Sequence, residues 1–246
     1  AWCWKAGGSG SANTTGSINT TKTSANTTSG FSIMQYTGNG TDEATIGHGI
    51  GIAPTFLITK KTSGSESWYV GSSGLPDWDY KLYFDTNDAT STNSPSVWGG
   101  AAPTSSVVSL GNSAPTNYSG ATYIMYAFAD VQGFSKVGGY TGNGDADGTF
   151  VYTGFRPAFI ILKRSDGADN WWIHDNKREG YNGNNAVLYT HIDNAESDST
   201  SIDLLSNGFK IRTTDSGYNP SGGNMIYIAF AEAPLVNSNG VPCNAR

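Results

Sequence analysis

The same pattern of residues occurs twice in this chain. Phe31 and Phe134 each precede a serine and, a few residues later, the run Tyr-Thr-Gly-Asn-Gly. Further on, Pro54 and Pro157 each open an apolar run, and each copy closes on Ala-Phe-Ala and an acidic residue. A spacing of about 100 residues is too long for a solenoid repeat and suits a small domain used twice. The repeated residues are apolar, aromatic and turn-forming, which favours architecture and binding over catalysis.

The repeat also predicts how the chain is divided. We expect one unit over residues 31–130 and a second over residues 131–235. Residues 1–30 are rich in Gly, Ser, Asn and Thr, which predicts a connector from a preceding module, either an extended strand packed on a neighbour or a flexible linker. Residues 236–246 are expected to form a C-terminal tail.

The composition indicates an all-β protein. The chain has 246 residues with 32 glycines, 12% aromatic and only 14% charged residues, so it is turn-rich and still able to form a core. Short runs of β-branched and aromatic residues alternate with Gly, Pro, Asn and Asp. About seven strands per hundred residues is typical of a β-sandwich, so we predict two tandem β-sandwich-like units, jelly-roll or immunoglobulin-like. The expected strands are 31–37, 44–48, 55–61, 67–71, 80–85, 106–110 and 122–130, then 134–140, 149–153, 158–164, 170–175, 186–190, 201–205, 208–213 and 224–232.

Three of these runs are apolar without alternation, at residues 56–58, 159–162 and 123–129. A strand with one face in water would alternate apolar and polar residues, so these runs predict burial on both faces. The two longest apolar runs, 121–129 and 224–231, could instead be short buried helices, but their density of Tyr, Ile and Thr favours strands.

Charge and hydropathy exclude some classes of partner. The formal net charge is −6, which disfavours binding to a phosphate backbone, so we expect no nucleic-acid partner. No run approaches the roughly 20 apolar residues that span a bilayer. Cys3 and Cys243 lie near opposite ends, and the sequence leaves open whether they form a disulfide.

One loop carries a weak calcium pattern. Asn143, Asp145 and Asp147 alternate as in the start of an EF-hand loop. The bidentate glutamate of such a loop is missing, because Gly154 holds its place, so a polar hairpin turn is the favoured interpretation and a structural calcium the alternative. No other cofactor is expected.

Two tryptophans in loops are candidates for a glycan site. Trp78 and Trp98 lie beside Gly, Pro or Asp, and an exposed indole can stack on the C–H face of a sugar. Asp77 and Asp79 would supply hydrogen bonds, or, in a less favoured alternative, the paired carboxylates of a polysaccharide depolymerase. Packing of the two indoles in the core is the competing interpretation.

The catalytic motifs expected of common enzymes are missing from the sequence. His48, His174 and His191 share no spacing that would place two of them on one face, and no Gly-x-Ser-x-Gly elbow occurs. We therefore expect a protein that is not an enzyme.

A set of motifs resembles a known family. They are Phe-Ser-Ile with Tyr-Thr-Gly-Asn-Gly, the stretches 47–54, 154–159 and 206–210, and the Ala-Phe-Ala closures. Together they are similar to a repeated C-terminal module in large virion proteins of tailed bacteriophages, notably marine ones. The resemblance implies a structural component of the virion, a tail fibre or surface appendage on the extracellular particle. It implies other virion proteins as partners, a homo-oligomer with a trimer favoured, and a host cell-surface glycan as a further candidate partner.

Overall fold

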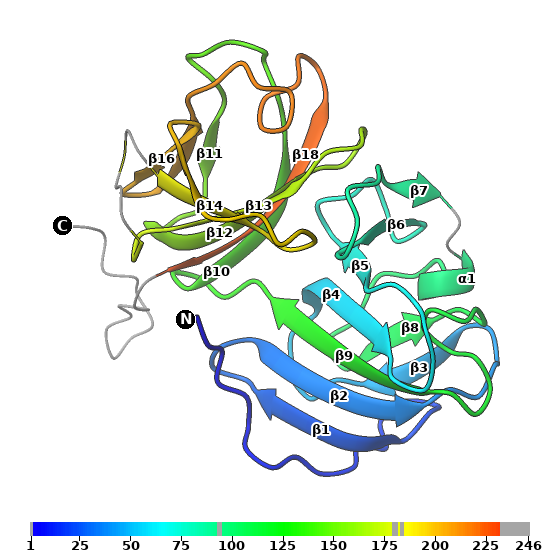
Figure 1. The fold of residues 1–246 in the computed structure, drawn as a ribbon. Coiled ribbons are helices and arrows are strands. Elements are labelled where there is room, and N and C mark those ends of the chain that lie inside the picture. The colour runs from blue at the N-terminus through cyan, green and yellow to red at the C-terminus, as the bar shows by residue number, and fades with distance from the viewer. Residues whose placement is uncertain (1, 93–94, 179–181, 183–184, 232–246) are drawn as a thin grey trace. The chain divides into compact units, whose positions relative to one another are not determined.

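The chain folds into two compact units, each described here by itself. The structure is a computed structural model that describes residues 2–92, 95–178, 182 and 185–231. Unit 1 comprises Ala1–Phe84 and Thr90–Asp130, and unit 2 comprises Asp85–Ala89 and Val131–Arg246. Both are all-β sandwiches, as the sequence predicts (Figure 1). The predicted tail at residues 236–246 and Cys243 lie outside the described residues, whereas Cys3 is exposed.

Unit 1 packs a large antiparallel sheet against a small one. Met34, Tyr123 and Met125 of the large sheet share one buried cluster with Ile46 and Leu110 of the small sheet. A short helix, α1 (Pro95–Trp98), precedes the last strand of the small sheet. The large sheet has the order β1 (Thr20–Asn26), β2 (Phe31–Thr37), β9 (Thr122–Ala129), β4 (Pro54–Lys61), β5 (Tyr69–Ser72), β6 (Tyr80–Tyr83) and β7 (Ser91–Thr92), and the small sheet pairs β3 (Ala44–Gly47) with β8 (Val107–Leu110).

Unit 2 has the same two layers. Ile160, Leu162 and Tyr227 of its large sheet are buried with Phe209 and Ile211 of its small sheet. The large sheet has the order β10 (Ser135–Thr141), β18 (Asn224–Ala231), β12 (Pro157–Arg164), β13 (Trp171–Asp175), β14 (Asn185–Tyr189) and β15 (Ser197–Ser199), and the small sheet has the order β11 (Phe150–Tyr152), β17 (Gly208–Ile211) and β16 (Ile202–Leu205).

The central strands of the two large sheets follow the same order and register. In unit 1 a β-bulge separates the pairs Pro54–Ala129 and Phe56–Phe128. In unit 2 an equivalent bulge separates Pro157–Ala231 and Phe159–Phe230. The predicted strands are thus present. Residues of both faces are buried in the runs 56–58 and 159–162, as expected, with Ile58 and Ile161 partly exposed. The run 123–129 alternates buried and partly exposed residues, so full burial on both of its faces is not observed. Duplication of one ancestral unit remains our interpretation of this correspondence.

Strands β2 and β10 show where the sequence repeat and the ladder diverge. Phe31 lies opposite Phe128, whereas the residue opposite Phe230 is Ser135. The shift arises because unit 2 has one more residue between its Phe and its Tyr-Thr-Gly-Asn-Gly run. Phe134 nevertheless contacts Phe230, with ring centroids 5.9 Å apart, so the aromatic packing is kept.

The connector predicted for residues 1–30 is in fact part of unit 1. Strand β1 pairs with β2 along its length, and Ile18 is buried in the core of unit 1. Ser11 pairs in turn with Thr23 on the outer side of β1. The flexible-linker alternative and the boundary at residue 31 are therefore corrected. Composition did not distinguish them, because a Thr-rich uncharged run suits both a linker and an edge strand.

A buried asparagine holds the Tyr-Thr-Gly-Asn-Gly turn of unit 1. The Asn39 N–H donates to Asn117 Oδ1 at 2.8 Å, and Asn117 Nδ2 donates to the Thr41 carbonyl at 2.8 Å. The Tyr36 hydroxyl donates to the Thr116 carbonyl at 2.8 Å. Gly38 passes so close that a Cβ there would lie 2.5 Å from the Tyr118 carbonyl oxygen, so only glycine fits.

Unit 2 repeats this arrangement bond for bond. The Asn143 N–H donates to Asn219 Oδ1 at 2.8 Å, and Asn219 Nδ2 donates to the Asp145 carbonyl at 2.7 Å. The Tyr140 hydroxyl donates to the Tyr218 carbonyl at 2.7 Å. We call these two arrangements the asparagine clamps. Most of the repeated motif is thus used to hold each sandwich together.

Candidate functional site

The structure places the two candidate tryptophans in the core of unit 1. Trp78 is 9% exposed and Trp98 1% exposed, and their rings meet edge to face with centroids 6.3 Å apart. The prediction that they form exposed stacking platforms is therefore wrong. The reason is Gly71 on β5, where a Cβ would lie 2.7 Å from Trp78 Cζ3 and 2.9 Å from Trp98 Cε2. The missing side chain gives the two indoles their space.

The two candidate carboxylates flank Trp78 in a turn. Asp77 Oδ1 accepts the Asp79 N–H at 2.7 Å, which fixes the turn. Asp79 Oδ1 is buried and has no hydrogen-bond partner among the described residues. Because both nearby indoles are buried, neither Trp78 nor Trp98 is available beside these carboxylates to stack on a sugar.

In unit 2 a histidine stands where unit 1 has Gly71. The register pairs Leu57 with Gly71 and, in the equivalent ladder, Ile160 with His174. His174 is fully buried, and its Nε2 lies 2.9 Å from the Tyr218 hydroxyl. Burial, together with the nearby Arg178 charge, lowers the pKa of His174 to about 3 against the opposing effect of Asp175. The imidazole is therefore a neutral core group at physiological pH.

Comparison of the two sequence copies would have located this exchange. Gly71 and His174 occupy the same place relative to the aligned tryptophans, Trp68 and Trp171. The spacing of the three histidines does not reveal this role of His174, because its neighbours come from distant parts of the sequence.

The calcium candidate folds as a polar turn. Asn143 Oδ1 accepts the Asp145 N–H at 3.0 Å, and Asp145 Oδ1 accepts the Asp147 N–H at 2.9 Å. Asp147 forms an ion pair with Lys210 at 2.8 Å, and this contact lowers the pKa of the Asp147 carboxyl. Across the described ranges no group of three or more His, Cys, Asp or Glu side chains is arranged to hold a metal ion. The loop is thus a polar turn, but it joins β10 of the large sheet to β11 of the small sheet, and these strands do not pair with each other. The expectation of a hairpin is therefore wrong.

A buried lysine in unit 2 also serves the scaffold. Lys163 on β12 has no exposed surface, and its Nζ donates to the carbonyl oxygens of Arg164 and Gly167. Burial lowers its pKa to about 8, while Asp169 and Asp88 favour the charged form. The side chain closes the hairpin that follows its own strand.

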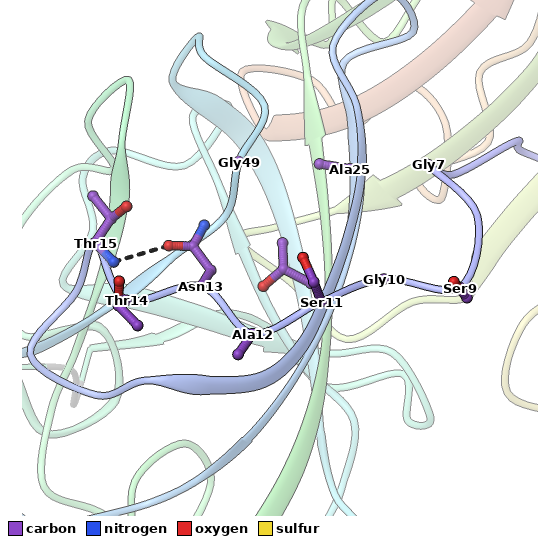
Figure 2. Close-up of a pocket in the computed structure, with 11 residues that line it drawn as sticks. Gly7, Ser9, Gly10, Ser11, Ala12, Asn13, Thr14, Thr15, Ala25 and Gly49 are labelled. Carbon is purple, nitrogen blue, oxygen red and sulfur yellow. Dashed lines mark hydrogen bonds between the residues drawn. The ribbon is translucent and has the colours of Figure 1, made fainter.

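The N-terminal segment of unit 1 borders an open polar depression of about 650 Å³. Figure 2 shows the chain passing along it, with the Thr15 N–H donating to Asn13 Oδ1 at 2.9 Å. The lining contains no charged and no aromatic side chain, so it offers hydroxyl, amide and backbone groups but neither acid–base catalysis nor ring stacking. It comprises Gly7, Ser9, Gly10, Ser11, Ala12, Asn13, Thr14, Thr15, Thr23, Ala25 and Gly49.

Exposed aromatic side chains occur instead on β11 of unit 2. Phe150 is 44% exposed and Tyr152 65% exposed, while Val151 between them faces the core. Alternation along a strand places both rings on the same outer face. Sequence reasoning recognised this strand but not its significance, although Phe-Val-Tyr is apolar on its outward side as well as its inward side.

The corresponding strand of unit 1 has small residues there. In unit 1, Ile46 of β3 pairs with Val108, and both are buried. In unit 2, Val151 of β11 pairs with Phe209, and both are buried as well. Ile46 therefore corresponds to Val151. Thr45 and Gly47 then correspond to Phe150 and Tyr152. The exposed ring pair is therefore a property of unit 2 alone.

Comparison with known proteins assigns the chain to one family. Residues 1–234 match a family model described as a domain of unknown function (DUF7483), so the chain belongs to that family. The match covers both sandwich units and the N-terminal segment. No curated protein and no solved structure matches the chain. No helix of the described part is long and apolar enough to cross a membrane.

We predict that Gly71→Ala destabilises unit 1. The added methyl group would collide with the rings of Trp78 and Trp98, and overpacking of this kind costs about 1–3 kcal/mol. Urea unfolding measures the loss. The control is Gly64→Ala, where the new Cβ would lie 3.4 Å from the flexible Lys61 side chain and change stability by less than about 0.5 kcal/mol. Equal effects of the two substitutions would contradict the account of the Trp78–Trp98 packing.

We predict that His174 makes the protein less stable in acid. Its pKa is about 3 when folded, below the value of about 6.5 in the unfolded chain, so the unfolded state binds more protons between these values. The free energy of unfolding should fall by up to about 1.4 kcal/mol per pH unit as the pH drops below about 6.5. In His174→Gln, which keeps a polar partner for Tyr218, this part of the slope should disappear. The same pH slope in both proteins would show that His174 is not buried as a neutral group.

Proposed function

We propose that this protein is a structural component of a bacteriophage virion, in a tail fibre or other surface appendage. It would act by rigid display, holding loops against a host surface or against neighbouring subunits. The observation that carries the proposal is how the repeated motif is used. The tyrosine, glycine and asparagine of each copy form the asparagine clamps, so the residues of the resemblance maintain a scaffold.

The proposal extends to partners and location. The protein would assemble with other virion proteins and with copies of itself, with a trimer favoured, and would lie on the surface of the extracellular particle. We do not assign it a catalytic role. The buried state of His174 and the scaffold contacts of Lys163 support this, because both groups are used to hold the fold.

Labelling of intact particles tests this function. Antibodies raised against the chain should bind a tail or surface appendage of phage particles whose genome encodes it, as seen by immunogold electron microscopy. Peptides of the chain should also be detected by mass spectrometry of gradient-purified particles. Particles that carry neither label nor peptide, from cells that express the chain, would refute a structural role in the virion.

A second candidate function is binding of a host-surface glycan. The observation that favours it is the exposed ring pair of Phe150 and Tyr152, which replaces the buried tryptophans as a stacking surface. On a glycan array, Tyr152→Ala should lose binding by at least about fivefold, since stacking on a ring contributes about 1 kcal/mol or more. The matched control is Tyr118→Ala, which removes a 58% exposed tyrosine from unit 1. Equal binding by both variants would exclude Tyr152 as a glycan platform.

A further inference from the structure

Strand β11 is an edge strand with outward-facing backbone groups. Among the described residues its one strand neighbour is β17. The Thr153 N–H donates to the Asn207 carbonyl at 3.0 Å, and the Thr149 carbonyl accepts the Ile211 N–H at 3.1 Å, so odd-numbered residues face β17. Because backbone groups alternate along a strand, Phe150 and Tyr152 direct their N–H and C=O groups away from the sheet.

Unit 1 shows the same edge covered. The Thr45 N–H donates to Ser17 Oγ at 2.8 Å, and the Thr45 carbonyl accepts the Ile18 N–H at 2.9 Å. Thr45 corresponds to Phe150, so both of its outward groups are satisfied by the N-terminal segment. In unit 2, the segment that leads directly into β10 is residues 131–134, and it is too short to reach β11 in the same way.

The side chains of β11 do not allow a chain segment to cover this strand as the N-terminal segment covers β3 in unit 1. In unit 1 the N-terminal segment passes directly over Gly47, where a Cβ would lie 2.3 Å from Asn13 Oδ1. Tyr152 stands at that position in unit 2, and its ring excludes a chain crossing the face there. A strand covering β11 therefore has to pair beside it, at the edge, with the two rings left on one face.

Apart from its short length of three residues, the edge of β11 lacks the usual features that prevent strand pairing. Its sequence Phe-Val-Tyr contains no lysine, proline or glycine and has high β-propensity. The charged groups on the adjoining face are already paired, Lys210 with Asp147 at 2.8 Å and Arg212 with Asp203 at 2.9 Å. Two such edges can approach without unpaired like charges between them.

We propose that β11 docks antiparallel against β11 of a second copy of this chain, about a two-fold axis at Val151. This register places Phe150 opposite Tyr152 of the second copy, and both are residues whose backbone groups face outward. Each outward N–H then meets a carbonyl of the second copy, whereas in unit 1 the Thr45 N–H is met by the Ser17 hydroxyl. The rings form cross-strand aromatic pairs on the outer face. The strand is self-complementary, which is why we assign the site to a second copy. The inference rests on the self-association part of the proposed function, and it replaces the favoured trimer by a two-fold contact between two copies.

The test is sedimentation equilibrium of the full chain and of Tyr152→Pro. Proline removes the outward N–H of residue 152 and leaves the β11–β17 hydrogen bonds intact, so the variant should fold with the circular dichroism spectrum of the parent. We expect two-copy assembly of the parent chain and a monomer for Tyr152→Pro. Tyr152→Ala, which loses the ring but keeps the N–H, should still assemble, with a dissociation constant raised about fivefold per lost ring pair. If proline disturbs folding, Tyr152→Lys gives a second edge-blocking variant that should also be monomeric.

Other outcomes separate this inference from the proposed function. A parent chain that stays monomeric at about 100 μM overturns the β11 inference. A trimer that is unchanged by both Tyr152→Pro and Tyr152→Lys overturns it as well. Neither outcome would contradict the proposed role in the virion. Glycan binding that is lost in Tyr152→Ala from a monomeric parent would assign the rings to a sugar and overturn the inference too. Two-copy assembly lost in Tyr152→Pro supports the inference even if particles are not labelled.

Discussion

The asparagine clamp is the interaction on which each sandwich depends. Asn117 and Asn219 are fully buried, and an unpaired amide in such a place costs about 1–3 kcal/mol, so the fold tolerates them only where every polar group has a partner. Asn117 joins the turn after β2, and Asn219 the turn after β10, to the loop before the last strand of the unit, and these segments lie far apart in sequence. The glycine before each turn permits this close approach. The clamp explains why the repeated motif contains Tyr, Gly and Asn together.

Local patterning was sufficient to predict most of the fold. The strands, their buried faces and the shared positions of Phe56 and Phe159 follow from alternation and from Gly and Asn turns. What the sequence did not show depends on contacts between distant residues. β1 was taken for a connector because its partner β2 is needed to identify it as a strand. Trp78 was expected to be exposed because the space that buries it is created by Gly71 on another strand.

The two units share the same arrangement of central strands and differ in the segments and side chains at the edge of the small sheet. Unit 1 adds β1 and the preceding segment, which close the edge of β3 and border the polar depression (Figure 2). Unit 2 has large aromatic rings at the corresponding edge and places His174 where unit 1 has a glycine. We therefore attribute the features that both units share to folding. We look for a binding role among the features that only one unit has. This reasoning directs attention from the tryptophans to β11.

The central claim is that the repeated motif is structural, and replacement of the clamp residues tests it most directly. Urea unfolding of Asn117→Ala and Asn219→Ala should show a loss of about 2–4 kcal/mol each, because several backbone groups lose their partner. The exposed residues Asn112 and Asn224 provide controls, whose replacement by alanine should change stability by less than about 0.5 kcal/mol. If both clamp variants unfold like the controls, the repeated motif is not what holds the units together and the account is contradicted.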